Sequence, residues 1–443
     1  MAPARDVALR QLRPEDWRLW RDLRLRALAD APDAFAETLA EARARDDAGW
    51  QALAAPRPHV VQLVAERGGA PAGMAVAVID LDDPARANLY AMWVAPEARG
   101  AGLGRALVDA ALRWTRGRAA LELSLQVTEG NEPARALYEG CGFRDTGRRE
   151  ALRGGGGLHG RVLGVRQPPL VMGVVNVTPD SFSDGGRYLD PAAAIDHGLA
   201  LAAEGADLLD VGGEATNPRA APIDAAEELR RVLPVIEGLI GGLSGGLSGG
   251  GGLAAAGPAV SVDTTKAAVA RAAVAAGAAI VNDVSGGLFD PAMPEALAGT
   301  GATYIAGHLR GRTIAEVFAA EAPVAWDDVA RELAQRLAAL PEDVRARAWV
   351  DPGLGFGKGA DPEANLELLR RAGELGRAVR RPVVVGPSRK RFLRRLVGAD
   401  PSLAALDAAT VAACLGAVRG GAQVLRVHNV ALLRAALAVY TRI

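Results

Sequence analysis

From residue 170 to the C-terminus, short apolar runs alternate with helical stretches, and this alternation limits the folds open to the chain. The runs that read as strands are 170–176, 207–211, 259–262, 279–282, 302–307, 347–351, 382–385 and 423–427. Eight strands, each followed by a helix, over about 275 residues predict a parallel (β/α)8 TIM barrel. An open, doubly wound α/β sheet is the alternative, because periodicity alone does not show whether a sheet closes.

Glycine-rich tracts and a proline pair mark the boundaries. Residues 154–157 are four consecutive glycines, which cannot lie inside a helix or strand, and the flanking segments 143–152 and 161–167 predict a hairpin. Pro168 and Pro169 then break the chain, so we expect one domain over 1–167 and a second over 168–443. A tract rich in Gly and Ser, 241–253, follows an expected helix over 223–240 and predicts a flexible insertion inside the second domain.

Composition narrows the class of protein. Half of the 443 residues are hydrophobic, which is enough to bury the cores of two domains. The formal net charge is −1, so no nucleic-acid partner and no membrane surface is expected. Two widely separated cysteines, Cys141 and Cys414, predict a reducing compartment. No segment reads as a signal peptide or a bilayer span, and we expect a cytoplasmic protein.

Polar side chains occur where every expected strand of the second domain ends, which in a barrel is where chemistry takes place. They are Asn176, Asp210, Asp263, Asn282, His308, Asp351, Lys390 and Arg426. Each has an ordinary explanation when taken alone, since Asp or Asn after a strand commonly caps a helix and a single histidine is commonly buried and hydrogen-bonded. Caps do not explain a lysine, arginines and a histidine at the same rim. The set predicts a concave polar site.

Four of these side chains suit a polar heterocycle. Asp263, Asn282 and Asp351 can accept hydrogen bonds from the N–H groups of a ring edge, because ionised carboxylates accept and do not donate. Lys390 can donate to a ring carbonyl. The pattern therefore indicates a planar ring that carries both donors and an acceptor.

The remaining groups suit phosphate. Arg426 and His428 are two residues apart on a strand, so their side chains point to the same face and can bind a phosphate or diphosphate. Asn176 supplies an oxygen for Mg²⁺, a hard ion that takes oxygen ligands together with phosphate. A heterocycle that carries a diphosphate fits the whole set.

The motifs at these strand ends are NVTPDSFSDGG, LDVGGEAT, SVDTTK, NDVSGG, DPGLGFGK, GPSRK and RVHN. Residues 168–443 thereby resemble the dihydropteroate synthases of folate synthesis over their full extent. The resemblance implies that (7,8-dihydropterin-6-yl)methyl diphosphate and 4-aminobenzoate are joined with release of diphosphate, that Mg²⁺ takes part, and that the protein is a homodimer. It implies pterin contacts from Asp263, Asn282, Asp351 and Lys390, and a diphosphate held by Asn176, Arg426 and His428. Lys390, Arg426 and His428 would be the catalytic residues.

For the second substrate the resemblance implies Thr216, Pro218 and Ser388 beside 4-aminobenzoate. The chain departs from the family pattern at three places. Its second loop reads Ala215-Thr-Asn-Pro218 where the family has Ser-Thr-Arg-Pro, Asn429 replaces an Asp, and Gly307 replaces a Met.

The first domain carries a different pair of motifs. An apolar strand, 89–94, runs into Arg99-Gly-Ala-Gly-Leu-Gly104 and then a helix with one apolar face. Glycines at a helix N-terminus allow backbone N–H groups to close on a phosphate. The second motif is Asn131-Glu-Pro-Ala-Arg-Ala-Leu-Tyr-Glu-Gly-Cys-Gly-Phe143. Together the two motifs resemble the GCN5-related N-acetyltransferases (GNAT), which have an α+β fold with a mixed central sheet.

This resemblance implies that acetyl-CoA binds with its pyrophosphate on the backbone amides from Arg99 through Gly100 and Gly102 to Gly104. Its pantetheine would lie along Met92 to Val94, Asn131 would contact the cofactor, and Tyr138 would protonate the departing thiolate. Tyr138 reads equally well as a core aromatic, and Cys141 reads as packing. The acceptor amine is not readable from the sequence, although an arylamine or the second domain itself is a working hypothesis.

Two other functions stay open. One is a pterin-binding module without synthase activity that tethers or regulates the acetyltransferase. The other is a pterin-dependent methyl-transfer protein on the same barrel, which the GPSRK and RVH motifs disfavour. Pterin binding without turnover would distinguish the module from a synthase.

Overall fold

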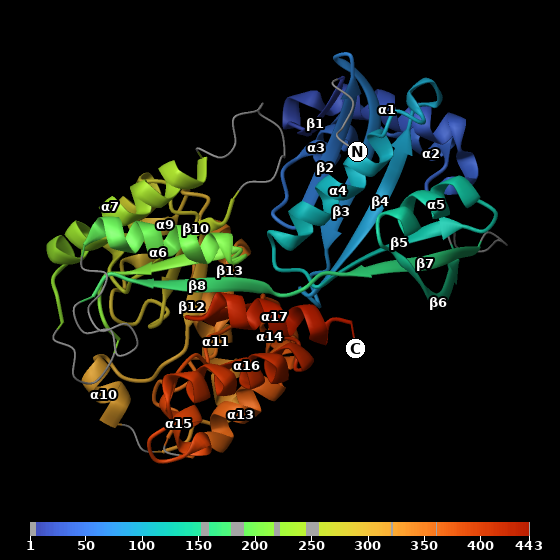
Figure 1. Ribbon diagram of the computed structural model, residues 1–443. Coiled ribbons are helices and arrows are strands. Elements are labelled where there is room, and N and C mark those ends of the chain that lie inside the picture. The colour runs from blue at the N-terminus through green and yellow to red at the C-terminus, as the bar shows by residue number, and fades with distance from the viewer. Residues whose placement is uncertain are drawn as a thin grey trace. The chain divides into compact units, whose positions relative to one another are not determined.

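The computed structural model describes residues 6–151, 159–178, 190–216, 222–244, 257–319, 322–359 and 361–442. The chain divides into two compact units, and the first ends at Gln167 where the second begins at Pro168 (Figure 1). Within the described ranges no helix has the length and apolar character needed to cross a bilayer.

The C-terminal unit is a closed parallel barrel. Its strands pair in the order β13-β12-β11-β10-β9-β8-β15-β14, and all pairs are parallel. A further parallel bridge between Val350 of β13 and Val383, just before β14, joins the two ends of this order. The sheet therefore closes, which decides against the open, doubly wound alternative. The strands are β8 (Leu170–Asn176), β9 (Leu208–Gly212), β10 (Ala259–Asp263), β11 (Ile280–Asp283), β12 (Thr303–Gly307), β13 (Ala348–Asp351), β14 (Val384–Val385) and β15 (Val424–Val427).

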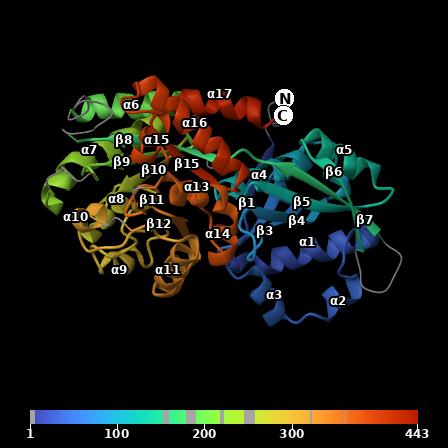
Figure 2. The same cartoon turned by 90° about the horizontal axis from the view of Figure 1, so that it is seen from below.

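Helices surround this ring of strands on the outside, as Figure 2 shows. Apolar side chains on their inner faces and on the strands form one continuous core. Several helices begin at a polar side chain that accepts from a first-turn N–H, as Asp190, Asp361 and Ser402 do. The helices are α6 (Pro191–Ala203), α7 (Ala225–Ser244), α8 (Ala267–Ala275), α9 (Met293–Leu297), α10 (Ile314–Ala319), α11 (Trp326–Ala338), α12 (Glu342–Ala346), α13 (Pro362–Arg370), α14 (Ala372–Val379), α15 (Arg391–Val397), α16 (Leu403–Arg419) and α17 (Val430–Tyr440).

Helix α7 corrects one expectation. The glycine-rich tract was expected to begin a flexible insertion at residue 241, but α7 continues to Ser244. Packing against α6 explains the extension, since a Cβ at Gly242 would lie only 3.1 Å from Leu199 Cδ2, and Leu243 packs against the core. The rest of the tract, 245–253, lies outside the described residues.

The N-terminal unit contains a seven-stranded mixed sheet in the order β1-β2-β3-β4-β5-β7-β6. Only β4 and β5 are parallel neighbours, and the segments expected to form a hairpin pair as antiparallel β6 and β7. The strands are β1 (Val7–Gln11), β2 (Val60–Arg67), β3 (Ala70–Ile79), β4 (Arg86–Val94), β5 (Glu122–Thr128), β6 (Arg144–Ala151) and β7 (His159–Arg166).

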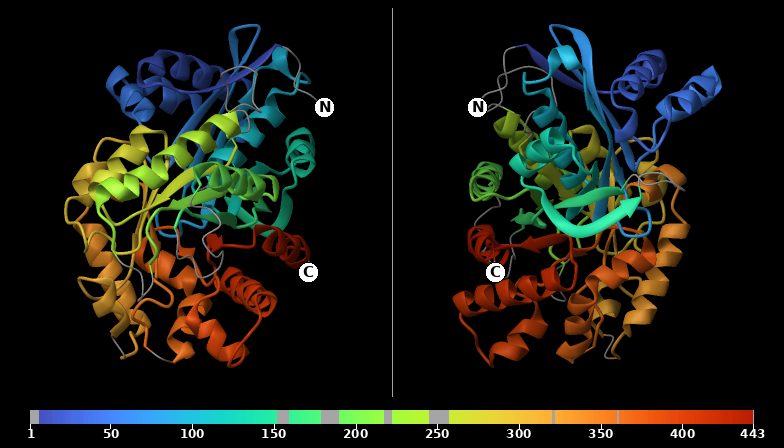
Figure 3. Two further views of the ribbon diagram at one scale, coloured as in Figure 1. Left: turned by 60° about the vertical axis from the view of Figure 1, so that its left-hand side comes forward. Right: turned by 90° about the vertical axis from the view of Figure 1, so that its right-hand side faces the viewer.

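Strands β4 and β5 separate partway along their length. They pair only from Arg86 with Glu122 to Leu89 with Leu125, although both strands continue. Beyond that point β4 carries a bulge, where Ala91 has a φ of 52° and the register with β3 shifts. Helices α1 (Trp17–Asp30), α2 (Leu39–Ala44) and α3 (Asp47–Ala54) lie on one side of the sheet and α4 (Leu103–Arg116) on the other, with α5 (Glu132–Gly140) beside β5 (Figure 3).

Gly307, which stands where the family pattern has a Met, has no room for a side chain in this structure. A Cβ there would lie 2.4 Å from the carbonyl oxygen of Val284.

We expect Gly307→Ala to lower the free energy of unfolding by about 1–3 kcal/mol through this overlap. Gly416→Ala is the matched control, because Gly416 lies in α16 with open space around it and should gain about 0.5–1 kcal/mol. Chemical denaturation of the full chain followed by circular dichroism measures both, and an unchanged midpoint for Gly307→Ala would contradict the packing.

Candidate functional site

Arg426, on β15, is the centre of the polar site inside the barrel. Its Nε donates to Asp210 Oδ2 at 2.6 Å, and its Nη2 donates to Asp263 Oδ2 at 2.7 Å. Asp210 is on β9 and Asp263 is on β10, so three strands meet through one guanidinium. Burial acts to lower the pKa of Arg426, but the two carboxylates outweigh burial and raise it. The arginine is therefore charged throughout the physiological range.

The residues expected to bind the heterocycle lie at the same strand ends. Asn282 Nδ2 donates to Asp210 Oδ2 at 2.9 Å, which fixes the orientation of its amide. Asp351 Oδ1 accepts from the Gly353 N–H at 2.7 Å. Burial raises the pKa of Asp263 to about 7, while Arg426 opposes this shift, and burial also raises the pKa of Asp351.

Lys390 lies just before α15, with its Nζ 3.7 Å from the centroid of the Phe356 ring. Burial and the nearby Arg426 lower the pKa of Lys390 to about 8, although Asp351 and Asp263 act in the opposite direction. The ammonium is thus close to losing its proton in the neutral range. The sequence did not single out Phe356 as its partner, because the contact joins two separate loops.

His428 and Ser388 form a pair. Ser388 Oγ and His428 Nδ1 are 2.8 Å apart, and the His428 backbone N–H also donates to this oxygen at 3.3 Å. Burial, assisted by Arg389 and Arg426, lowers the pKa of His428 well below its usual value. The imidazole is therefore neutral at pH 7. It can offer a ligand one hydrogen bond but no positive charge.

Asn176, at the end of β8, lies beside Asp263. A Cβ at Gly212 would be 3.9 Å from Asn176 Oδ1 and 3.5 Å from Asp263 Cβ, so both side chains border the same glycine. Magnesium fits this position because it takes few protein ligands and keeps waters and phosphate oxygens. Across the described ranges no cluster of three or more His, Cys, Asp or Glu side chains could hold a metal by itself.

The residues expected around 4-aminobenzoate are only partly described. Thr216 is half-buried at the end of a described segment, and Ser388 pairs with His428 as above. Pro218 and the altered Asn217 lie outside the described residues, as do residues 179–186 of the NVTPDSFSDGG motif. Glu214 ties the two sides of the second loop, because its Oε1 accepts from the Ile223 N–H at 3.1 Å. Its other oxygen and Glu228 both bind Lys266 Nζ.

Asp210 was expected at the strand ends that form the site, but the sequence did not predict that it would link other site residues. It is fully buried, and its Oδ2 links Arg426 to Asn282. Its Oδ1 is also buried and, within the described ranges, has no hydrogen-bond partner. A signal was present, because an aspartate inside the apolar run Leu208–Val211 is rare unless it is paired.

The replacement of Asp by Asn429 has a structural explanation. Asn429 Nδ2 donates to Asp407 Oδ2 at 3.1 Å, and its Oδ1 accepts from the Leu432 N–H to cap α17. Asp407 also pairs with Arg389 at 2.8 Å. An aspartate at 429 would bring a second negative charge to Asp407, whereas the amide donates to it.

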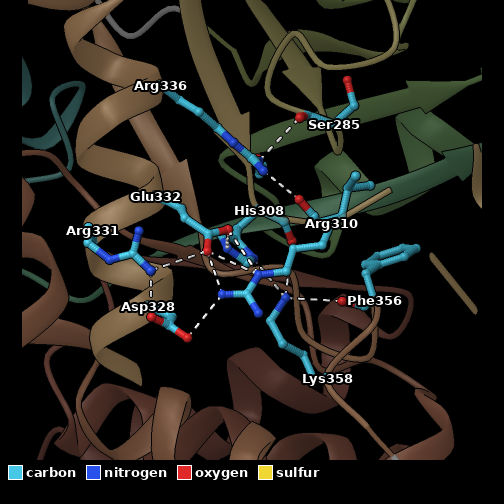
Figure 4. A network of polar contacts seen from close by, with 11 residues as sticks. Ser285, His308, Arg310, Asp328, Arg331, Glu332, Arg336, Phe356 and Lys358 are labelled. Atoms are coloured by element: carbon cyan, nitrogen blue, oxygen red, sulfur yellow. Dashed lines mark hydrogen bonds and ion pairs between the residues drawn. The ribbon is translucent and has the colours of Figure 1, made fainter. Parts of the chain in front are cut away.

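A second buried network surrounds His308, at the end of β12 (Figure 4). His308 Nε2 is 3.1 Å from Glu332 Oε2, and its Nδ1 is 3.0 Å from Lys358 Nζ. Burial and Lys358 lower the pKa of His308 to about 2, so it is neutral. Lys358 also donates to the carbonyl oxygens of His308 and Phe356 at 3.2 and 3.0 Å. Here His308 is a satisfied buried histidine, the ordinary reading of its sequence position.

Arg310 and Arg336 complete this network. Arg310 pairs with Glu332 and with Asp328. Arg336 donates to the carbonyl oxygens of Ser285 and Gly307 at 3.2 and 2.5 Å, and also to that of Leu309. These bonds hold the loops that follow β11 and β12.

The first N-terminal motif forms a glycine-rich loop that leads into the N-terminus of α4, as expected. Gly100 and Gly102 have φ values of 79° and 87°, which favour glycine, and Gly102 caps α4. A Cβ at Gly104 would lie 2.9 Å from Leu137 Cδ2 and 3.6 Å from Met92 Cε. The Arg99 side chain turns back to donate to the Val94 carbonyl at 3.1 Å. A Cβ at Gly100 or Gly102 would meet no atom within 4 Å, so there is open space beside the backbone at both residues.

Two predicted acetyltransferase residues have structural roles as well. Asn131 Oδ1 accepts from the Ala134 N–H and caps α5. Tyr138 is buried, with its ring 5.9 Å from that of Phe143, and burial raises its pKa. Cys141 is half-buried and packs against the same core. The proposed contacts of Asn131 and Tyr138 with a cofactor stay predictions.

Comparison with known proteins gives the same division. The pterin binding enzyme family matches residues 172–428, and the acetyltransferase (GNAT) family matches residues 17–143. A dihydropteroate synthase of Mycobacterium leprae is 45% identical over 273 residues, which cover 59% of this chain and 89% of that protein. The type-2 dihydropteroate synthase of Escherichia coli is 39% identical over 272 residues, covering 61% of this chain and 94% of that protein.

Solved structures agree with the fold. The dihydropteroate synthase of Xanthomonas albilineans with 4-aminobenzoic acid has a TM-score of 0.53 at 41% identity, covering 63% of this chain and 94% of that one. That of Thermus thermophilus in complex with 4-aminobenzoate has a TM-score of 0.52 at 35% identity, covering 62% and 95%. Fold and site define a pterin-binding (β/α)8 barrel preceded by an acetyltransferase domain. The chain belongs to the pterin binding enzyme family.

The buried Lys358 makes a testable contribution to stability. Its pKa is lowered to about 7 by burial, whereas an unfolded lysine keeps its usual value of 10.5. Between these values the unfolded chain binds the extra proton, so this group makes the free energy of unfolding rise with pH. We expect Lys358→Met to remove up to about 1.4 kcal/mol per pH unit of that slope. Denaturation of both proteins at pH 7, 8 and 9 measures the difference, and parallel pH dependences would contradict it.

Proposed function

We propose that the barrel is a dihydropteroate synthase, which joins (7,8-dihydropterin-6-yl)methyl diphosphate to 4-aminobenzoate and releases diphosphate. The observation that carries this proposal is the convergence of Arg426, Asp263 and Lys390 at one end of a closed parallel barrel. Relatives with this name match the barrel over most of their own length.

The arrangement suits a reaction in which the leaving group departs early. An electron-rich pterin stabilises positive charge on the adjacent CH₂ as the C–O bond to the diphosphate breaks. Asp263, Asn282 and Asp351 would hold the pterin edge, and Lys390 would donate to its carbonyl. Arg426 and His428 would stabilise the negative charge that develops on the diphosphate. The amine nitrogen then forms the C–N bond and loses its proton, so orientation matters more than a strong base.

Asn176 is the residue we propose to hold Mg²⁺ with the diphosphate. The ion would neutralise part of the leaving-group charge when bound. Thr216, Pro218 and Ser388 are proposed to border 4-aminobenzoate. A cytoplasmic homodimer is part of the same proposal.

We further propose that the N-terminal domain is an acetyl-CoA-dependent N-acetyltransferase. The strand β4 beyond Leu89 has no partner in β5, so its peptide groups can receive the amides of pantetheine. The first turn of α4, after Gly100 and Gly102, leaves backbone N–H groups for the pyrophosphate. Met92 and Val94 border the first region, and the amides from Arg99 to Gly104 form the second.

Diphosphate release tests the synthase directly. Purified protein with the dihydropterin diphosphate, 4-aminobenzoate and Mg²⁺ should release diphosphate only when 4-aminobenzoate is present. Arg426→Ala and Lys390→Ala should each lower kcat/KM by at least about 100-fold, because each removes a charge-assisted contact to a ligand. Arg419→Ala, an exposed arginine at the end of α16, is the matched control and should retain full activity. Tight pterin binding without diphosphate release would instead favour a non-catalytic pterin-binding module.

The pH profile provides an independent test. Asp263, with a pKa of about 7, loses its negative charge and one of its acceptor oxygens becomes a donor when it is protonated, so kcat/KM should fall as pH drops below 7. Lys390, with a pKa of about 8, loses its charge as pH rises, so kcat/KM should also fall above 8. In Lys390→Arg the guanidinium stays protonated, and the alkaline fall should disappear although overall activity is lower. An alkaline limb that persists in this variant would assign it to another group.

A further inference from the structure

The N-terminal unit contains a cavity of about 600 Å³. Its lining includes none of the residues proposed to bind acetyl-CoA. Its floor is formed by Gln62, Val76 and Ala91 on three neighbouring strands, and Trp20 and Trp50 are among its walls. The charged side chains in the lining are Arg24, Glu37, Glu41, Arg45 and Arg57. A cavity of this size can accept a small aromatic molecule.

The cavity lies on the face of the sheet opposite α4. Side chains alternate between faces along a strand. A Cβ at Gly73 would be 3.2 Å from Leu107 of α4, so odd-numbered β3 residues near it face α4 and Val76 faces away. The gap between β4 and β5 therefore connects the two faces of the sheet. A ligand that passes through this gap would extend from the N-terminus of α4 to the cavity on the opposite face. Ala91, in the β4 bulge, borders both the separation and the cavity.

Both carboxylates of the lining are already engaged. Glu37 Oε2 accepts from Arg24 Nε at 2.9 Å, and its Oε1 lies 2.7 Å from Arg45 Nη2. Glu41 accepts from the Thr38 backbone N–H and hydroxyl, both at 2.7 Å. Because both carboxylates are engaged in this way, neither is free to act as a general base or to bind an ammonium group.

Positive charge is in excess. The lining holds three arginines against two glutamates. Arg24 Nη1 is buried and has no hydrogen-bond partner among the residues that the structure describes. Among the described residues Arg57 pairs with no carboxylate, and its Nη2 reaches only the Leu53 carbonyl, at 3.4 Å. An anionic group on a ligand would satisfy these donors.

We propose that this cavity binds the acetyl acceptor, and that the acceptor is an aromatic amine carrying an anionic group. The inference rests on the proposed acetyltransferase function. The arginines would bind the anion, and the half-buried apolar side chains of the lining, Leu53, Val76 and Ala91, would contact the ring. An aromatic amine is unprotonated at neutral pH, so it can attack without the general base that the lining does not supply.

The step balances without any further reactant. The amine nitrogen attacks the thioester carbonyl carbon, the C–S bond breaks, and an amide forms. The nitrogen loses one proton and the sulfur leaves as CoA thiol. 4-Aminobenzoate, the proposed second substrate of the barrel, belongs to this chemical class.

Three probe amines separate the two required features. 4-Aminobenzoate has both, 4-aminobenzamide lacks the anion, and 4-(aminomethyl)benzoate has a protonated aliphatic amine. CoA release by the full chain with acetyl-CoA should give a kcat/KM for 4-aminobenzoate at least about tenfold above the other two. Acetylation mainly of 4-(aminomethyl)benzoate, or equal use of 4-aminobenzamide, would overturn the proposal.

Variants locate the anion site. Arg57→Gln should lower kcat/KM for 4-aminobenzoate about tenfold and leave that for 4-aminobenzamide nearly unchanged. Arg43→Gln, an exposed position on α2 outside the cavity, is the matched control and should change neither. Acetyl-CoA binding is measured separately by calorimetry. If acetyl-CoA binds but no anionic aromatic amine is acetylated, the acceptor inference fails and the acetyltransferase proposal stands. If acetyl-CoA does not bind, both fail.

Discussion

The polar site depends on one buried guanidinium held between two carboxylates. Placing a charge inside a protein costs several kcal/mol unless it is paired, and Arg426 meets this condition through Asp210 and Asp263. Because the three residues come from β15, β9 and β10, the same contacts join separate strands of the barrel. Two of the five N–H donors of Arg426 are used in these bonds. The site can therefore offer a preoriented cation to a diphosphate without reorganising when the ligand arrives.

Two lysines contact Phe356, the buried Lys358 and the half-buried Lys390, and they illustrate a second principle. Lys358 binds the Phe356 carbonyl, and Lys390 lies over the Phe356 ring. Burial lowers the pKa of each, but their surroundings differ. Lys358 is held by carbonyl oxygens and a neutral histidine, so it fixes the loop after β13. Lys390 lies close to Asp263 and Asp351, and its electrostatic balance will change when a ligand occupies the site.

Sequence patterns predicted the strands and, from their number and their alternation with helices, a closed barrel, but they left an open sheet as the alternative. The ends of each expected barrel strand agree with the structure to within two residues. This is because a parallel strand that is buried on both faces has a nearly continuous apolar sequence. Closure depends on the bridge between Val350 and Val383, which no local pattern encodes. The strand ends likewise predicted which polar residues would converge. They included Asp210 but did not predict its contacts, because these form only when other strands bring Arg426 and Asn282 to it.

The end of α7 shows the limit of composition as a guide. Glycines at 241 and 242 suggested a linker, yet packing against Leu199 keeps these residues helical. Two departures from the family pattern are likewise understood only from their contacts in the structure. Gly307 packs closely against the Val284 carbonyl and Asn429 donates to Asp407, and neither departure touches the contacts of Arg426.

A shared amine would give the two domains a chemical reason to be joined. The barrel reaction needs the lone pair of an aromatic amine, and acetylation delocalises that lone pair into an amide. A domain that acetylates 4-aminobenzoate would therefore compete with the barrel for one nucleophile rather than supply it. The ratio of the two products would then follow acetyl-CoA and pterin diphosphate concentrations, since each chain carries one domain of each kind. Such competition requires no contact between the domains, only a common pool of the amine.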